Sequence, residues 1–122
     1  MITGWYSDTI GNLHGFLRVL DGNITAFDAP PGGQITGSTW IPDGPPPSIN
    51  PVGAIAGIYA DSGGVEHGFV RTPDGTFTTI DFPGADYTEA LAINRAGVIV
   101  GDFVTRTHVT ADLFGLPMAR SK

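Results

Sequence analysis

The chain contains 122 residues with a formal net charge of −6, and it includes 18 glycines, 10 prolines and no cysteine. The lack of cysteine excludes disulfides, thiolate nucleophiles and cysteine-ligated metal sites, and the acidic balance argues against nucleic acid as a partner. The apolar runs are only a few residues long, so we expect no membrane-spanning segment and no membrane partner. Residues 1–8 have neither a basic region nor an apolar stretch, so no signal peptide is expected there.

An internal repeat organises the sequence. Residues 2–30 align without a gap with residues 55–83, and 14 of these 29 positions are identical. A further copy follows at a period of 44, because residues 49–57 match residues 93–101. The recurring positions indicate what each copy needs in order to fold.

We treat residues 1–122 as one all-β domain built from these copies. The first copy exceeds the 44-residue period by about nine residues, because its offset is 53. We assign the excess to a proline-rich loop, since such sequences favour turns and stiff connections. In chain order, the parts are the first copy at about 1–48, its inserted loop at 37–48, the second copy at about 49–92 and a partial third copy at about 93–122.

Short strands are predicted along the chain, and no segment has a helical period. The β-branched and aromatic residues favour strands, and Asp74-Gly75 between two alternating runs predicts a tight hairpin. The strands expected from residue 54 onward are, in chain order, 54–60, 67–72, 76–82, 91–94 and 98–103. Each copy is therefore a meander of about four strands, which is the size of a β-propeller blade.

The number of repeats is too small for a closed ring. Fewer than three 44-residue units fit into 122 residues, whereas closed propellers have at least about four blades. Repeat units do not bury their faces alone. We therefore expect a β-propeller-like fold that is closed by homo-oligomerisation or belongs to a longer array. A β-sandwich or barrel built from the repeats is the alternative.

Two motifs of the repeat match a known family. His14-Gly15-Phe16 and His67-Gly68-Phe69 each precede an Asp-Gly turn, and Ala90–Gly101 has the pattern Ala-x-x-Ile-Asn-x-x-Gly-x-Ile-x-Gly. Over about residues 2–104 the chain resembles the bacterial extracellular HAF-type repeat family, which is named for a His-Ala-Phe tripeptide. Glycine replaces the alanine of that tripeptide here. The resemblance implies a β-propeller-like array and an extracellular or periplasmic location.

Two histidines occupy equivalent positions in the repeat. His14 follows Asp8 by six residues, and His67 follows Asp61 by six residues. A carboxylate can orient an imidazole for base chemistry or ligand binding. Alternatively, the aspartate caps a turn while the histidine donates to the backbone. Because both copies carry the pair, the structural role is the favoured hypothesis.

Two arginines also recur. Arg18 and Arg71 lie across the Asp-Gly turns from Asp28 and Asp81, which predicts cross-strand ion pairs. Their charged groups could instead hydrogen-bond a ligand. The candidate ligand-binding residues with basic side chains are His14, His67, Arg18 and Arg71.

Three acidic residues depart from the repeat. Glu66 stands where the first copy has Leu13, and Asp102 stands where it has Trp5. A glycoside hydrolase needs two carboxylates in different environments, one on each side of the scissile bond. Glu66, Glu89 and Asp102 are therefore the candidate catalytic residues of a small glycoside hydrolase, unless they are solvated surface acids.

Aromatic side chains complete the set of candidates. Trp5, Trp40 and Tyr87 could stack on a sugar or pack between blades, and Trp40 lies in the stiff loop. The leading hypothesis is a repeat module that binds an extracellular ligand, with a carbohydrate as the expected class. A glycoside hydrolase is the alternative, and a purely structural repeat is the third. No P-loop or His-Glu-x-x-His motif occurs, so we expect no cofactor and no metal.

Overall fold

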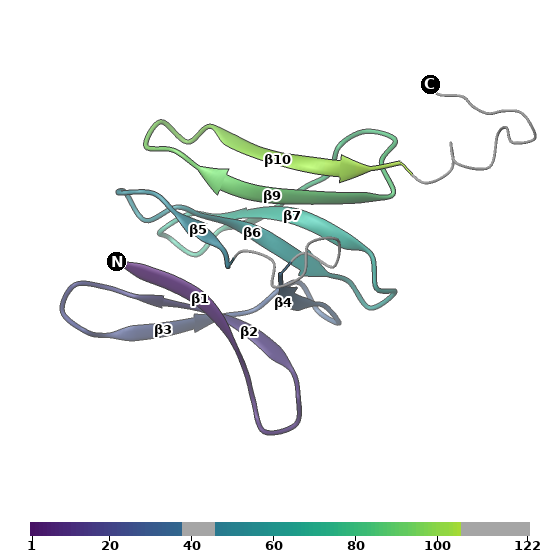
Figure 1. The fold of residues 1–122 in the computed structure, drawn as a ribbon. Coiled ribbons are helices and arrows are strands. Elements are labelled where there is room, and N and C mark those ends of the chain that lie inside the picture. The colour runs from purple at the N-terminus through teal and green to yellow at the C-terminus, as the bar shows by residue number, and fades with distance from the viewer. Residues whose placement is uncertain (38–45, 106–122) are drawn as a thin grey trace, which may run out of the picture.

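The computed structural model describes residues 1–37 and 46–105. These residues form antiparallel strands without a helix, and none of the sheets closes into a barrel. The predicted all-β class is therefore confirmed. Three sheets lie one above another, with the largest in the middle (Figure 1).

We name the sheets by their place in the chain. The N-terminal sheet consists of β1 (Ile2–Ser7), β2 (Leu13–Arg18) and β3 (Ile24–Phe27), in that spatial order. The central sheet has the order β4-β6-β7-β8, and β5 also pairs with β6. Its strands are β4 (Gln34–Thr36), β5 (Ser48–Ile49), β6 (Ile55–Ala60), β7 (Glu66–Arg71) and β8 (Phe77–Ile80). The C-terminal sheet is the hairpin of β9 (Tyr87–Ile93) and β10 (Ile99–Val104).

Most predicted strands are confirmed. The segments expected at 54–60, 67–72, 76–82 and 98–103 are β6, β7, β8 and β10, and 91–94 is the end of the longer β9. The Asp74-Gly75 hairpin is also confirmed. The N–H of Gly75 donates to the carbonyl of Thr72 at 2.9 Å, and φ at Gly75 is +93°, a conformation that favours glycine.

The boundary of the four-stranded meander differs from the predicted copy at 49–92. The meander runs from Gln34 to Ile80, and β9 pairs with β10 rather than with β8. The reason lies in the connection after β8, where the chain crosses to the next sheet. There the N–H of Phe82 donates to Oγ1 of Thr88 at 2.9 Å. The last strand of the copy therefore begins a new sheet.

Corresponding residues of the sequence repeat pair in the same register. Gln34 pairs with Ala60, and Tyr87 pairs with Val104. Tyr87 lies 53 positions after Gln34, and Val104 lies 44 positions after Ala60. β5 and the second half of β9 continue this pattern with β6 and β10. The extra residues of the first copy thus fall between β4 and β5 in the sequence. At the corresponding point of the later copy, between Val100 and Gly101, the pairing of β10 with β9 shifts register.

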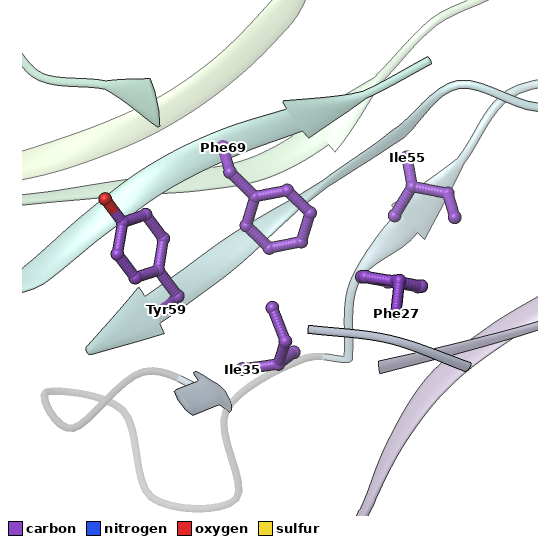
Figure 2. Packing of buried hydrophobic residues seen from close by; sticks show 5 residues of the cluster. All are labelled: Phe27, Ile35, Ile55, Tyr59 and Phe69. Atoms are coloured by element: carbon purple, nitrogen blue, oxygen red, sulfur yellow. The ribbon is translucent and has the colours of Figure 1, made fainter. Parts of the chain in front are cut away.

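The main core lies between the N-terminal and central sheets. Figure 2 shows its five buried residues gathered between strands of these sheets. Phe69 and Phe27, from the two sheets, meet edge to face with centroids 6.1 Å apart. The core residues are Phe27, Ile35, Ile55, Tyr59 and Phe69.

A second core joins the central and C-terminal sheets through small side chains. Ala54 and Ala56 pack with Ala90 and Ile93. At Gly68 an added Cβ would lie 3.1 Å from the Cβ of Ala90 and 3.2 Å from its backbone nitrogen. A larger residue at Gly68 would therefore push β9 away from β7. β6 is consequently buried on both faces, which explains its continuous apolar sequence.

Replacement of Phe69 by alanine should lower the free energy of unfolding by about 3–5 kcal/mol, because the ring is fully buried. Phe16→Ala is the matched control, since it removes the same ring from the equivalent, half-buried position of the N-terminal sheet. Phe16→Ala should cost clearly less in denaturant unfolding. Equal losses in the two variants would contradict the position of the main core.

Candidate functional site

His67 lies between two carboxylates. Its Nε2 is 2.8 Å from Oδ2 of Asp61, and its Nδ1 is 2.6 Å from Oδ1 of Asp81. Tyr59 on the neighbouring strand stacks on the imidazole with centroids 5.0 Å apart. Burial opposes the charge of His67, but the hydrogen bonds to both carboxylates outweigh burial and raise its pKa. Both ring nitrogens can donate together only in the imidazolium form.

His14 has the same surroundings in the N-terminal sheet. Its Nε2 is 2.9 Å from Oδ2 of Asp8, and its Nδ1 contacts Oδ1 of Asp28. The hydrogen bonds to Asp8 and Asp28 raise the pKa of His14, and His14 in turn lowers the pKa of Asp8. We name the two sets the His14 cluster (Asp8, His14 and Asp28) and the His67 cluster (Asp61, His67 and Asp81).

The first aspartate of each cluster caps a turn. Oδ1 of Asp61 accepts the N–H groups of Gly63 and Val65 at 2.9 and 3.0 Å, and Asp8 caps the corresponding turn in the same way. The predicted turn cap is therefore present. The predicted donation from histidine to the backbone is wrong. In each cluster Nε2 of the histidine contacts Oδ2 of the capping aspartate, and Nδ1 contacts the second aspartate, Asp28 or Asp81.

Two adjoining cavities lie beside the loops that carry the clusters. One cavity of about 410 Å³ is lined by residues of the His14 cluster and of the connection from β3 to β4, and another of about 370 Å³ reaches the turn at Asp61. The two cavities share Leu13, Gly32 and Gln34. We name their union the polar groove. Its polar lining includes Asn12, His14, Asp28, Gln34, Asp61 and Ser62.

Sequence reasoning missed Gln34 and Asn12 as site residues. The side-chain Oε1 of Gln34 accepts the N–H of Leu13 at 2.9 Å, which fixes the carboxamide in the polar groove. The signal was present in the repeat, because the second copy has Tyr87 and Val65 at the two corresponding positions. These differences between copies are functional signals of the same kind as the acidic substitutions.

The arginines take other places than predicted. Asp28 and Asp81 form their ion pairs with His14 and His67, and no ion pair joins them to Arg18 or Arg71 among the described residues, so the predicted arginine pairs are wrong. The guanidinium of Arg71 lies 5.1 Å from the ring centroid of Phe27 and packs against the main core. Arg18 is exposed on β2. Neither arginine lines the polar groove.

The three acidic candidates separate into buried and exposed residues. Glu66 and Glu89 are each only 1% exposed, so the interpretation of these two as solvated surface acids is wrong. Asp102 is exposed and pairs with Glu89 across β9 and β10. Glu89 and Asp102 both line a third cavity of about 270 Å³, whereas Glu66 does not.

Two phenylalanines line the same third cavity. The rings of Phe82 and Phe103 stack almost parallel, with centroids 3.9 Å apart and an angle of 4° between their planes. Sequence reasoning missed this pair. One repeat earlier the corresponding residues are Ala29 and Tyr59, so the pair is specific to one end of the chain.

The remaining aromatic candidates do not gather at one site. Trp5 is exposed on β1, and Tyr87 is half-buried at the start of β9. Neither lines one of the three cavities. Trp40 lies outside the described residues, and so does most of the predicted loop at 37–48. Of the predicted binding residues that the structure describes, His14 alone lines the polar groove.

Neither a metal cluster nor a membrane helix is found within residues 1–37 and 46–105. No three histidine, aspartate or glutamate side chains are grouped there to hold a metal ion. The same residues include no helix with the length and apolar character needed to cross a bilayer.

No protein-family model matches the chain, and no match is found among curated proteins or solved structures. The function is therefore argued from the geometry of the polar groove and its surroundings.

The two clusters predict a dependence of stability on pH. The pKa of each histidine is raised on folding, so its contribution is complete below the unfolded pKa of about 6.5 and is lost as pH rises through the folded pKa. The pKa values of Asp8 and Asp61 are lowered from 3.8, so their contribution is lost as pH falls through the folded values. The Tm should be highest between roughly pH 4 and 6.5.

Thermal unfolding followed by circular dichroism between pH 3 and 9 measures this profile. A double variant, His14→Gln with His67→Gln, should have a lower Tm near pH 6 and should lose the decline on the alkaline side. A wild-type Tm that is unchanged or rises from pH 6 to 9 would contradict the protonated histidines.

Proposed function

We propose that this chain is a β-propeller-like repeat module that binds a carbohydrate in the polar groove. The observation that carries the proposal is a pair of adjoining cavities, of about 410 and 370 Å³, that share three lining residues and are lined by hydrogen-bonding side chains. Two adjoining cavities of this kind suit a chain of several sugar units better than a single small molecule. The proposal keeps the leading sequence hypothesis and assigns it to a defined surface.

The lining has the chemistry that sugar hydroxyls require. The carboxylates of Asp28 and Asp61 accept hydrogen bonds, while the amides of Asn12 and Gln34 both donate and accept them. A hydroxyl group is itself donor and acceptor, so it can satisfy either kind of partner. The groove therefore offers complementary partners along its length.

The charge and stiffness of the groove narrow the ligand class further. The carboxylates of Asp28 and Asp61, together with the net charge of −6, oppose the binding of anionic saccharides. One wall contains Pro30 and Pro31, whose fixed backbone dihedrals reduce the entropy lost on binding. Uncharged oligosaccharides are the ligands that this combination favours.

The propeller-like assignment rests on the repeat and on strand pairing. Equivalent residues in β4 and β9 pair with equivalent residues in β6 and β10, which supports stacked, blade-like units. The resemblance to the HAF-type repeats also supports an extracellular or periplasmic location, where polysaccharides are available as ligands.

Asp28→Asn should weaken the binding of an uncharged oligosaccharide by about tenfold, which corresponds to about 1.4 kcal/mol. Asp81→Asn is the matched control, because Asp81 holds His67 as Asp28 holds His14 but does not line the polar groove. This control should change the Kd by less than about twofold. Isothermal titration calorimetry with ligands selected from an oligosaccharide panel measures both values. Equal Kd changes in the two variants would remove the groove as the binding site.

A glycoside hydrolase remains the second candidate, because Glu89 and Asp102 are cross-strand partners at one cavity. Side chains directly opposite on antiparallel strands have Cβ atoms about 4.5–5.5 Å apart, and retaining glycosidases hold their carboxyl groups about 5–5.5 Å apart. Glu89 is buried and Asp102 is exposed, so the two carboxylates have the different environments that an acid and a nucleophile need.

If this second activity exists, Glu89→Gln and Asp102→Asn should each lower kcat on a chromogenic glycoside by at least about 100-fold, with the fold retained in circular dichroism. Asp86→Asn removes a nearby acid that does not line the cavity, and it should leave turnover unchanged. Absence of turnover in the wild-type protein on a broad substrate panel would exclude the hydrolase. If saccharide binding were also absent, a purely structural repeat would remain.

A further inference from the structure

Each of the three sheets has one face that carries the same residue pattern. The pattern consists of isoleucine and glycine two positions apart on one strand, and it occurs at Ile2 and Gly4, at Ile55 and Gly57, and at Ile99 and Gly101. Side chains two residues apart lie on the same face of a strand. We name this side of each sheet its Ile-Gly face.

The central sheet has its Ile-Gly face covered by the N-terminal sheet. Ile55 and Phe69 on this face are fully buried, and they belong to one core cluster with Phe27 of β3. Leu17 of β2 packs against the same cluster. The cover is therefore supplied by the opposite face of the preceding sheet in the chain.

The same arrangement is repeated one sheet further along the chain. Ile99 on the Ile-Gly face of β10 packs against the second core, which includes Ala56 and Val70 of the central sheet. Ala56 and Val70 are paired residues on the face opposite to Ile55. In both contacts of the chain, an Ile-Gly face is thus covered by the opposite face of the sheet before it.

No other described sheet of the chain covers the Ile-Gly face of the N-terminal sheet. Ile2 and Tyr6 on its Ile-Gly face are 53% and 41% exposed, whereas their counterparts Ile55 and Tyr59 are 0% and 6% exposed. Ile24, which pairs with Arg18 on the same face, is also exposed. Among the described strands, β1 also pairs with β2 alone, whereas its counterpart β6 has partners on both edges.

The C-terminal sheet exposes the face that is equivalent to the covering face of the other two sheets. Val100 alternates with Ile99 and therefore lies on the face opposite to the second core, where it is 60% exposed. Ala92, its cross-strand partner, and Asp102 on the same face are exposed as well, whereas Glu89, which pairs with Asp102, is buried. Val100 corresponds in the repeat to Ala56, which covers an Ile-Gly face within the chain. Figure 1 shows the N-terminal and C-terminal sheets on opposite sides of the central sheet.

We propose that a second copy of this chain covers the exposed Ile-Gly face of the N-terminal sheet with the outer face of its own C-terminal sheet. The contact repeats between two chains the stacking that occurs twice within one chain. It joins two different surfaces, so each copy offers one surface of each kind. Two copies joined at both ends bring together the three described sheets of each chain, a combined number within the range of about four to eight blades in closed propellers.

Sedimentation velocity over a series of concentrations tests the association of the wild-type chain. The expected result is a discrete species of more than one chain that gains population with concentration. Ile2→Glu on the Ile-Gly face and Val100→Glu on the outer face should each give a monomer, because each places a charge in the contact. Ile24→Glu is a second variant of the first surface and should behave like Ile2→Glu.

A mixture of Ile2→Glu and Val100→Glu chains provides the decisive arm of the experiment. Each variant retains the surface that the other has lost, so the mixture should form a heterodimer and nothing larger. Leu20→Glu is the matched control, since Leu20 is 89% exposed in the turn between β2 and β3 and belongs to no strand of either surface, and it should associate like the wild type. Formation of the heterodimer also proves that both variants are folded.

Three results would overturn the proposal. They are a wild-type chain that remains monomeric at all concentrations, a Val100→Glu variant that still self-associates, and a mixture that forms no heterodimer although circular dichroism shows both variants folded. Self-association does not depend on the saccharide. Failure of binding in the polar groove would therefore leave this result unchanged, and failure of association would leave the binding experiment unchanged.

Discussion

The structure depends on one constraint, which is that the central sheet buries both of its faces. β6 is almost fully buried along its length, and this is possible only because the sheets on each side approach closely. Gly68 allows β7 to contact Ala90, and Phe27 fills the space on the other side. The N-terminal and C-terminal sheets are held in place by this packing, because each buries one face against the central sheet. The loops at the ends of the strands therefore acquire fixed relative positions.

The histidine clusters act on those loops. In the His67 cluster, the imidazole connects Asp61, in the turn after β6, to Asp81, where the chain leaves the central sheet after β8. His14 connects the corresponding residues of the N-terminal sheet. Both clusters occur at the same positions of the repeat, which fits a structural function. The polar groove lies beside Asp28, where the chain leaves β3 and connects to β4. The shared histidine clusters are thus combined with residues such as Gln34 that are not shared between the copies, and the proposed binding chemistry uses both kinds of residue.

The sequence alone predicts local features well and tertiary partners poorly. The strands, the Asp74-Gly75 hairpin and the turn cap of Asp61 follow from contacts within a few residues, so alternation and turn chemistry are sufficient. The burial of Glu89 and the second carboxylate at His67 depend on stacking or on where the chain changes sheets. No local pattern encodes those relations. The differences between copies are the most useful sequence signal, since they identify both the acidic residues and Gln34 as candidates. They do not predict which of these residues lie close together in the fold.

The central functional claim is that an uncharged oligosaccharide binds along the polar groove, and NMR titration of the isotopically labelled chain tests it most directly. Saturable shifts of backbone amides at residues 12–14, 28–34 and 61–64, with little change at β9 and β10, are the predicted result. Shifts confined to Phe82, Glu89 and Phe103 would instead place the ligand in the third cavity. That outcome, or no saturable shift with any member of a broad panel, would contradict the assignment of the groove.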